Sequence, residues 1–133
     1  MRFLHNDDLG KLLLRLCVGG LILLHGIAKL LDPASLNGIA QQLAEAGIPS
    51  FVAYGVLIGE IVAPLMALVG WQARIGGLLM AINMVVALVL FHTPQLWTLN
   101  GQGGWALELQ GMFLFGALAI TFLGSGRMAV RPD

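Results

Sequence analysis

The feature that most constrains this chain is its first long apolar segment, Leu9–Leu31, which carries Arg15, His25 and Lys29. As a helix, about 23 residues rise about 34 Å, which is enough to cross about 30 Å of hydrocarbon. An ionisable side chain in hydrocarbon costs at least about 2.5 kcal/mol and is usually satisfied by a partner inside a helix bundle. We therefore expect His25 and Lys29 to face partners on other membrane helices.

The composition favours a membrane protein over a soluble domain. Of the 133 residues, 58% are hydrophobic and only 11% are charged, whereas a soluble domain carries about 25% charged residues. A formal net charge of zero leaves no basic surface for nucleic acid. The single cysteine, Cys17, cannot form a disulfide or a Cys-x-x-Cys motif within the chain. Redox chemistry would therefore need a bound cofactor, a lipid-soluble substrate or a protein partner.

Three more apolar segments follow the first, at about residues 51–69, 75–91 and 105–123. Residues 33–46 have apolar side chains at helical spacing and polar ones on the other side, and they are too few to span a bilayer. We therefore predict an all-α membrane protein in one domain, residues 1–133. Its four transmembrane helices form a bundle, with a short interfacial helix between the first span and the second.

The basic residues predict the orientation of these four spans. One side of the membrane would hold six of the seven basic residues, and the other side would hold only Lys29. By the positive-inside rule, both termini and the short second loop lie in the cytoplasm. The six residues on the predicted cytoplasmic side are Arg2, Lys11, Arg15, Arg74, Arg127 and Arg131.

Five polar side chains fall in the outer half of the predicted bundle and are candidates for a ligand site. Counted by helical rise from the outer end, Lys29 and His92 lie near the surface and Glu108 lies one turn deeper. His25 lies about two turns deep, on the same helix face as Lys29. Glu60 lies near the midplane, where a carboxylate is either protonated or partnered. We predict that Lys29 pairs with Glu108 and that His25 hydrogen-bonds towards Glu60, directly or through water.

Plainer interpretations stay open for three of these residues. Lys29 could be satisfied by snorkelling to the interface. His92 could be an ordinary histidine at the edge of a loop, and Glu108 could be only a structural partner.

Other residues are expected to support the bundle. Asn83 lies near the midplane of the third span. Arg15 should snorkel towards the cytoplasm or bond the turn at residues 70–74. Gly55 and Gly59, four residues apart, would let a neighbouring helix approach closely.

The spacing of the polar residues favours some chemistries over others. His25 and His92 lie at different depths, which argues against a haem held between them. No local spacing signature marks a metal site, and no triad pattern supports nucleophilic catalysis. A quinone is easier to accommodate, because its head group needs only one or two hydrogen-bond partners beside an apolar cleft and a route for protons. His25, Lys29 and Glu60 could provide these.

Several short motifs resemble, in the same order, those of the DoxX family of small bacterial membrane proteins. They are Arg15-Leu, Gly19-Gly20, His25-Gly-x-x-Lys29, Gly47-Ile-Pro49, Glu60, Gly70 with Arg74, Phe91-His92 and Gly124-x-Gly126-Arg127. The resemblance implies a four-helix inner-membrane protein whose family-like polar positions are Arg15, His25, Lys29, Glu60 and His92. Some family members are subunits of a thiosulfate:quinone oxidoreductase, and others are linked to oxidative-stress complexes or to operons for metal-binding modified peptides.

Three functional hypotheses follow from these observations. The first is a quinone-interacting or otherwise redox-associated membrane subunit, with His25 and Glu60 binding the head group or exchanging protons and Lys29 in electrostatic support. The second is a non-catalytic anchor or assembly partner of a redox or metal-handling complex, working with a protein partner or a second copy. The third is a small solute or metal transporter, which would need an oligomer because one chain has so few helices.

Overall fold

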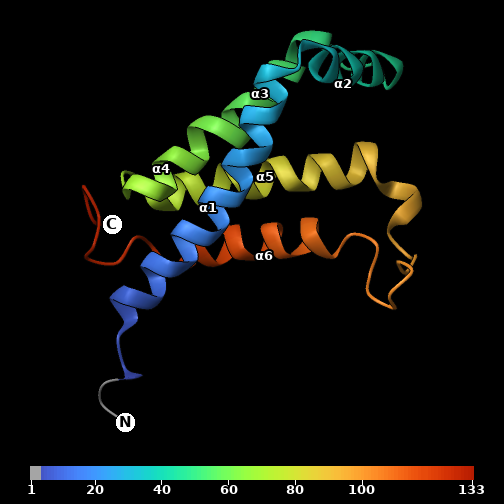
Figure 1. The fold of residues 1–133 in the computed structure, drawn as a ribbon. Helices are drawn as coiled ribbons and strands as arrows, with labels where there is room; N and C mark the ends of the chain where they lie inside the picture. The colour runs from blue at the N-terminus through green and yellow to red at the C-terminus, as the bar shows by residue number, and fades with distance from the viewer. Residues whose placement is uncertain (1–3) are drawn as a thin grey trace.

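The computed structural model describes residues 4–133, and this part of the chain is helical, with no strand beyond two isolated β-bridges. Helix α1 (Asp7–Leu31) crosses the molecule, and α2 (Pro33–Glu45) turns away from its end (Figure 1). Helices α5 (Ala73–Phe91) and α6 (Glu108–Leu123) run side by side. A short 3₁₀ turn, η4 (Thr93–Gln95), begins the loop between them.

Between α2 and α5, residues 50–69 form one apolar rod made of four joined pieces. These are η2 (Ser50–Tyr54), α3 (Gly55–Leu57), η3 (Ile58–Val62) and α4 (Ala63–Val69). This rod, α1 and α5 are each long and apolar enough to cross a membrane. Helix α6 is apolar but shorter, with 16 residues. The protein is therefore an all-helical membrane protein with three clear candidate spans.

The predicted helix limits agree closely with the observed ones where local capping signals are strong. Helix α1 begins where the Asn6 side chain accepts a hydrogen bond from the Leu9 backbone N–H at 3.0 Å. It ends at Leu31, and after the cap residue Asp32, Pro33 opens α2 at the first helical position, where its missing N–H costs nothing. The fourth apolar helix begins three residues later than predicted, at Glu108.

The core lies where α1, α4, α5 and α6 meet. Val18 and Ile22 of α1 pack there with small residues of α4 and with methionines of α5. Gly26 of α1 lies so close to the rod that a Cβ at this position would come within 2.2 Å of the Glu60 carbonyl oxygen. Small residues at such positions let membrane helices approach each other closely.

The π-helical turn η3 has a local cause in Pro64. A proline has no N–H, and its ring clashes with the carbonyl four residues earlier, which here belongs to Glu60. Here the backbone leaves the α-helical hydrogen-bond pattern and forms a wider π-helical turn, in which the Ala63 N–H donates to the Ile58 carbonyl five residues back. The turn contains Glu60, so the proline helps to set the direction of that side chain.

Arg15 of α1 links this helix to the end of α4 and to the C-terminal segment. It is buried, with 1% of its surface exposed. Its guanidinium donates to the carbonyls of Ala67 and Leu68 in the last turn of α4, and to those of Ser125 and Met128 in the C-terminal segment. Arg15 therefore does not snorkel. It lies against the expected turn, since a Cβ on Gly70 would come within 2.5 Å of its Nη2, but its hydrogen bonds go to carbonyls before that turn and in the C-terminal segment.

Candidate functional site

The centre of the candidate site is an ion pair between α1 and the π-helical turn. Lys29 Nζ donates to both carboxylate oxygens of Glu60, at 2.7 Å and 2.5 Å. The Glu60 side chain is only 5% exposed, and that of Lys29 is 26% exposed. A carboxylate this deep in an apolar bundle needs a cation or a proton, and here the cation lies in direct contact.

This pairing corrects one sequence-based prediction. Lys29 was expected to bind Glu108, but Glu108 is exposed at the start of α6, where its carboxylate lies 3.4 Å from the Asn100 amide. Lys29 binds Glu60 instead, so its side chain points inwards and does not snorkel to the interface. Glu108 is absent from the residues that line the cavity beside the ion pair.

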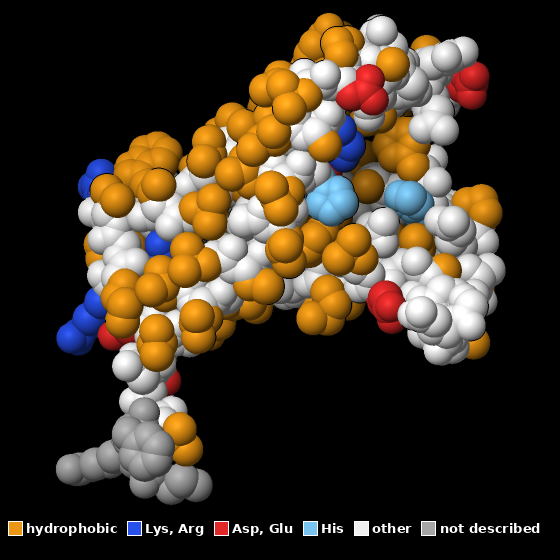
Figure 2. Space-filling model, viewed as in Figure 1, with side chains coloured by type: hydrophobic (Ala, Val, Ile, Leu, Met, Phe, Trp, Pro, Cys, Tyr) orange, Lys and Arg blue, Asp and Glu red, His pale blue; other side chains and the backbone are white. Residues whose placement is uncertain are grey.

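A cavity of about 210 Å³ opens beside the Lys29–Glu60 pair. Its polar lining comes from α1, η3, the residue after α5 and the first turn of α6, and its apolar lining comes from α1, α5 and α6. We call it the polar cavity. The polar lining residues are His25, Lys29, Glu60, His92 and Gln110, and the apolar ones are Ile22, Met84, Ala87, Leu109 and Phe113. Figure 2 shows histidine side chains and a basic side chain at a hollow in an otherwise mostly hydrophobic face.

The structure thus brings together four of the five predicted site residues. His25 is exposed and packs edge-on against the Phe113 ring of α6, with ring centroids 5.6 Å apart. His92 directly follows α5, and its Nδ1 lies 3.0 Å from Gln95 Oε1. His25 and Glu60 line the same cavity, and the predicted hydrogen bond between them, direct or through water, stays a prediction.

Sequence reasoning missed one polar residue of this site. Gln110 lies two residues beyond Glu108 and lines the cavity, whereas Glu108 does not. Two residues along a helix turn a side chain by about 200°. The sequence shows that Glu108 and Gln110 are both polar, but which of the two faces the cavity depends on the rotation of α6 about its axis.

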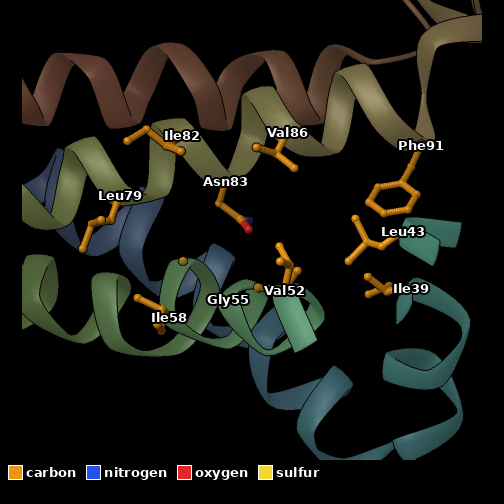
Figure 3. Close-up of a pocket in the computed structure, with 12 residues that line it drawn as sticks. Ile39, Leu43, Val52, Gly55, Ile58, Leu79, Ile82, Asn83, Val86 and Phe91 are labelled. Carbon is orange, nitrogen blue, oxygen red and sulfur yellow. The ribbon is translucent and has the colours of Figure 1, made fainter. Parts of the chain in front are cut away.

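Of the two glycines in the rod, only Gly59 makes a close contact with another helix, at Asn83 of α5. A Cβ on Gly59 would lie 2.5 Å from the Asn83 Cβ, so the predicted close helix approach occurs at Gly59, against α5. A Cβ on Gly55 would meet nothing within 4 Å. Gly55 faces open space within the described chain, and Asn83 projects into the same region (Figure 3).

The described side chains form no obvious metal centre. Within residues 4–133, no group of three or more His, Cys, Asp or Glu side chains is arranged to hold a metal ion.

Comparison with known proteins assigns the chain to a family. The DoxX family profile matches residues 10–93. The chain belongs to the DoxX family. The match covers α1 to the start of the loop after α5, and it includes His25, Lys29, Glu60 and His92 of the polar cavity. Gln110 and Phe113 of α6 lie outside it.

A curated relative extends the similarity over most of this DoxX-family chain. A protein of Bacillus subtilis (strain 168) named "Putative oxidoreductase CatD" is 28% identical to it over 125 residues. The aligned region covers 94% of this chain and 87% of that protein. No solved structure gives a significant match.

Proposed function

We propose that this DoxX-family protein is a redox-associated membrane subunit that binds a quinone head group in the polar cavity. The observation that carries the proposal is the Lys29–Glu60 ion pair, which lines a cavity of about 210 Å³ beside two histidines and a glutamine. The oxidoreductase name of the Bacillus subtilis relative agrees with a redox association.

The donor set of the cavity suits a quinone. A quinone presents two carbonyl oxygens, which accept hydrogen bonds, on a flat apolar ring. The Lys29 ammonium and the Gln110 amide can donate to such oxygens, and the histidine rings can donate or accept. Met84 and Phe113 offer apolar contact for the ring face. When bound, a quinone would supply the electron-carrying chemistry that the side chains of this chain lack.

The residues of the chain would then bind, orient and exchange protons. Lys29 would hold a carbonyl oxygen by a charge-assisted hydrogen bond. His25 and His92 lie on the more open side of the cavity, which suits them to pass protons between a bound ring and water. Electrons would come from a partner, because the single cysteine of the chain provides no dithiol centre. This requirement is the reason to propose a subunit instead of a complete enzyme.

We also infer that α6 is a fourth span and that both termini lie in the cytoplasm of a bacterial cell, with the protein in its cytoplasmic membrane. Arg74, at the start of α5, donates to the carbonyls of Thr121 and Phe122, at the end of α6. The two helices are thus antiparallel over similar depth, although 16 residues rise only about 24 Å. The Arg127 N–H also donates to Asp8, which joins the beginning of α1 to the C-terminal segment.

The test compares two carboxylates that differ in position. Wild type, Glu60→Gln and Glu108→Gln are purified in native-lipid nanodiscs. Quinone is then extracted with organic solvent, and the amount released per protein is measured. Glu60→Gln should lower the bound quinone strongly, because it removes the charge that holds Lys29 in place. Glu108→Gln should leave it unchanged, because Glu108 lies outside the cavity. Circular dichroism and elution volume check that each variant is folded.

The proposal fails if the wild type neither carries quinone nor binds added quinone saturably. It also fails if the two variants lose quinone equally.

A further inference from the structure

A second cavity lies on the other side of the rod, between α2, the rod and α5. It has a volume of about 200 Å³, and we call it the apolar groove. Its wall is formed by apolar side chains of α2, the rod and α5, together with Gly55, Gly59 and Asn83. Among these lining residues, only Asn83 has a polar side chain. Figure 3 shows its amide pointing from α5 towards Val52 and Gly55.

A third cavity of about 280 Å³, which we call the bridging cavity, lies between the apolar groove and the polar cavity and shares lining residues with both. The bridging cavity shares Asn83, Val86 and Phe91 with the groove. It shares Lys29 and His92 with the polar cavity. The three spaces therefore follow one another, from an apolar wall to the Lys29–Glu60 ion pair.

The groove opens towards the membrane side of the bundle. Ile58 of the rod and Ile82 of α5 border it and are each about half exposed, which in a bilayer means exposed to lipid. Helix α2 closes the end near the bridging cavity with Ile39 and Leu43, and Leu43 is 2% exposed. The amphipathic helix therefore contributes its apolar face to the groove.

We infer that the apolar groove holds the hydrocarbon tail of the ligand whose head group occupies the polar cavity, and that this ligand enters sideways from the bilayer. The inference rests on the proposed quinone site and adds the route and the second half of the ligand. The succession of three adjacent cavities with shared lining residues favours a tail over an unrelated occupant. The Asn83 amide, at the junction, offers a hydrogen bond to a polar head group as it passes.

The groove should give the tail room without adding much affinity, so a side chain that fills the groove should exclude the tail and weaken binding of the tailed ligand. A hydrocarbon tail leaves lipid for a wall of similar polarity, so it gains little free energy from the exchange. A head group without a tail can reach the polar cavity from water through its open side and does not need the groove. Blocking the groove should therefore affect only tailed ligands.

Gly55→Leu is the variant that blocks the groove with least disturbance. A Cβ on Gly55 meets no atom within 4 Å, so the leucine side chain extends into the open groove. Gly20→Leu is the matched control, because a Cβ on Gly20 also meets nothing within 4 Å and Gly20 lines none of the three cavities. Both changes place leucine in an apolar segment.

The experiment measures binding of a dimethoxy-methyl-benzoquinone, with and without a decyl tail, to both variants and wild type in nanodiscs. Gly55→Leu should weaken binding of the tailed quinone by about tenfold or more and change that of the tail-less quinone by less than about twofold. Gly20→Leu should bind both quinones like the wild type.

Three results would overturn the inference. Equal binding of the tailed quinone by Gly55→Leu and wild type would show that the groove is not the route, and equal weakening of both quinones would show a general disturbance. Release of a bound lipid or of a second copy of the chain by Gly55→Leu, with quinone binding intact, would assign the groove to that occupant. Failure of the tail-less quinone to bind the wild type would instead contradict the proposed head-group site.

Discussion

A double-mutant cycle on Lys29 and Glu60 tests whether the ion pair stabilises the bundle. Lys29 Nζ lies 2.7 Å and 2.5 Å from the two carboxylate oxygens, so at an effective dielectric constant of about 20 their attraction is about 6 kcal/mol. Removing each ion from water costs several kcal/mol, which offsets much of this attraction. We therefore expect a net coupling of about 2 kcal/mol, within the range of about 0.5–3 kcal/mol for residues in contact.

The single variants should show the larger effect. Lys29→Gln and Glu60→Gln should each lower the free energy of unfolding by about 3 kcal/mol, near the low end for a broken buried pair because Lys29 keeps 26% exposure. The double variant should then lose about 4 kcal/mol instead of about 6 kcal/mol. Reversible unfolding in mixed micelles, followed by circular dichroism, measures these values.

The same substitution at an exposed glutamate controls for the effect of changing glutamate to glutamine. Glu108→Gln, at an exposed site, should change the free energy of unfolding by no more than about 0.5 kcal/mol. Added salt should change the Lys29–Glu60 coupling little, because buried pairs are weakly screened. A coupling below about 0.5 kcal/mol, or one that salt abolishes, would refute the view that this contact is a buried and stabilising pair.

Three other variants test the packing and the orientation. Gly26→Ala should destabilise the bundle by about 1–3 kcal/mol, because the added Cβ would meet the Glu60 backbone carbonyl. Gly10→Ala, in open space, should not destabilise it. Equal effects of the two changes in unfolding assays would contradict the close approach at Gly26. Arg15→Lys should lower the thermal midpoint and expose the C-terminal segment to protease, because an ammonium cannot replace a planar fork bound to four carbonyls. In a cysteine-free background, Thr98→Cys should react with an impermeant maleimide from outside the cell and Val130→Cys only after lysis; reaction of both from one side would disprove the four-span orientation.

Local signals made most helix limits predictable. The apolar periodicity of Leu9–Leu31 and the Asp32-Pro33 step mark the end of one helix and the start of the next through chemistry within a few residues. The start of α6 was less predictable. There, Trp105 is apolar but belongs to a turn, because its indole N–H donates to the Leu96 carbonyl and its backbone bridges to Leu99.

The partner of Lys29 could not be read from the sequence for a geometric reason. Counting residues along straight helices gives the depth of each side chain but not its direction around the helix axis. By depth, Glu108 was the nearer carboxylate for Lys29. The choice of Glu60 depends on the close contact at Gly26 and on the π-helical turn before Pro64, which are consequences of packing.

The most direct test of the central claim is to locate a bound quinone. An azido-benzoquinone is photolysed in native-lipid nanodiscs, and the labelled peptides are mapped by mass spectrometry. We predict labels on residues that line the polar cavity, such as His25, Gln110 and Phe113, and their loss when unmodified quinone competes or when Lys29→Gln is used. Labels spread over the exposed apolar faces, without competition, would contradict a quinone site in this cavity.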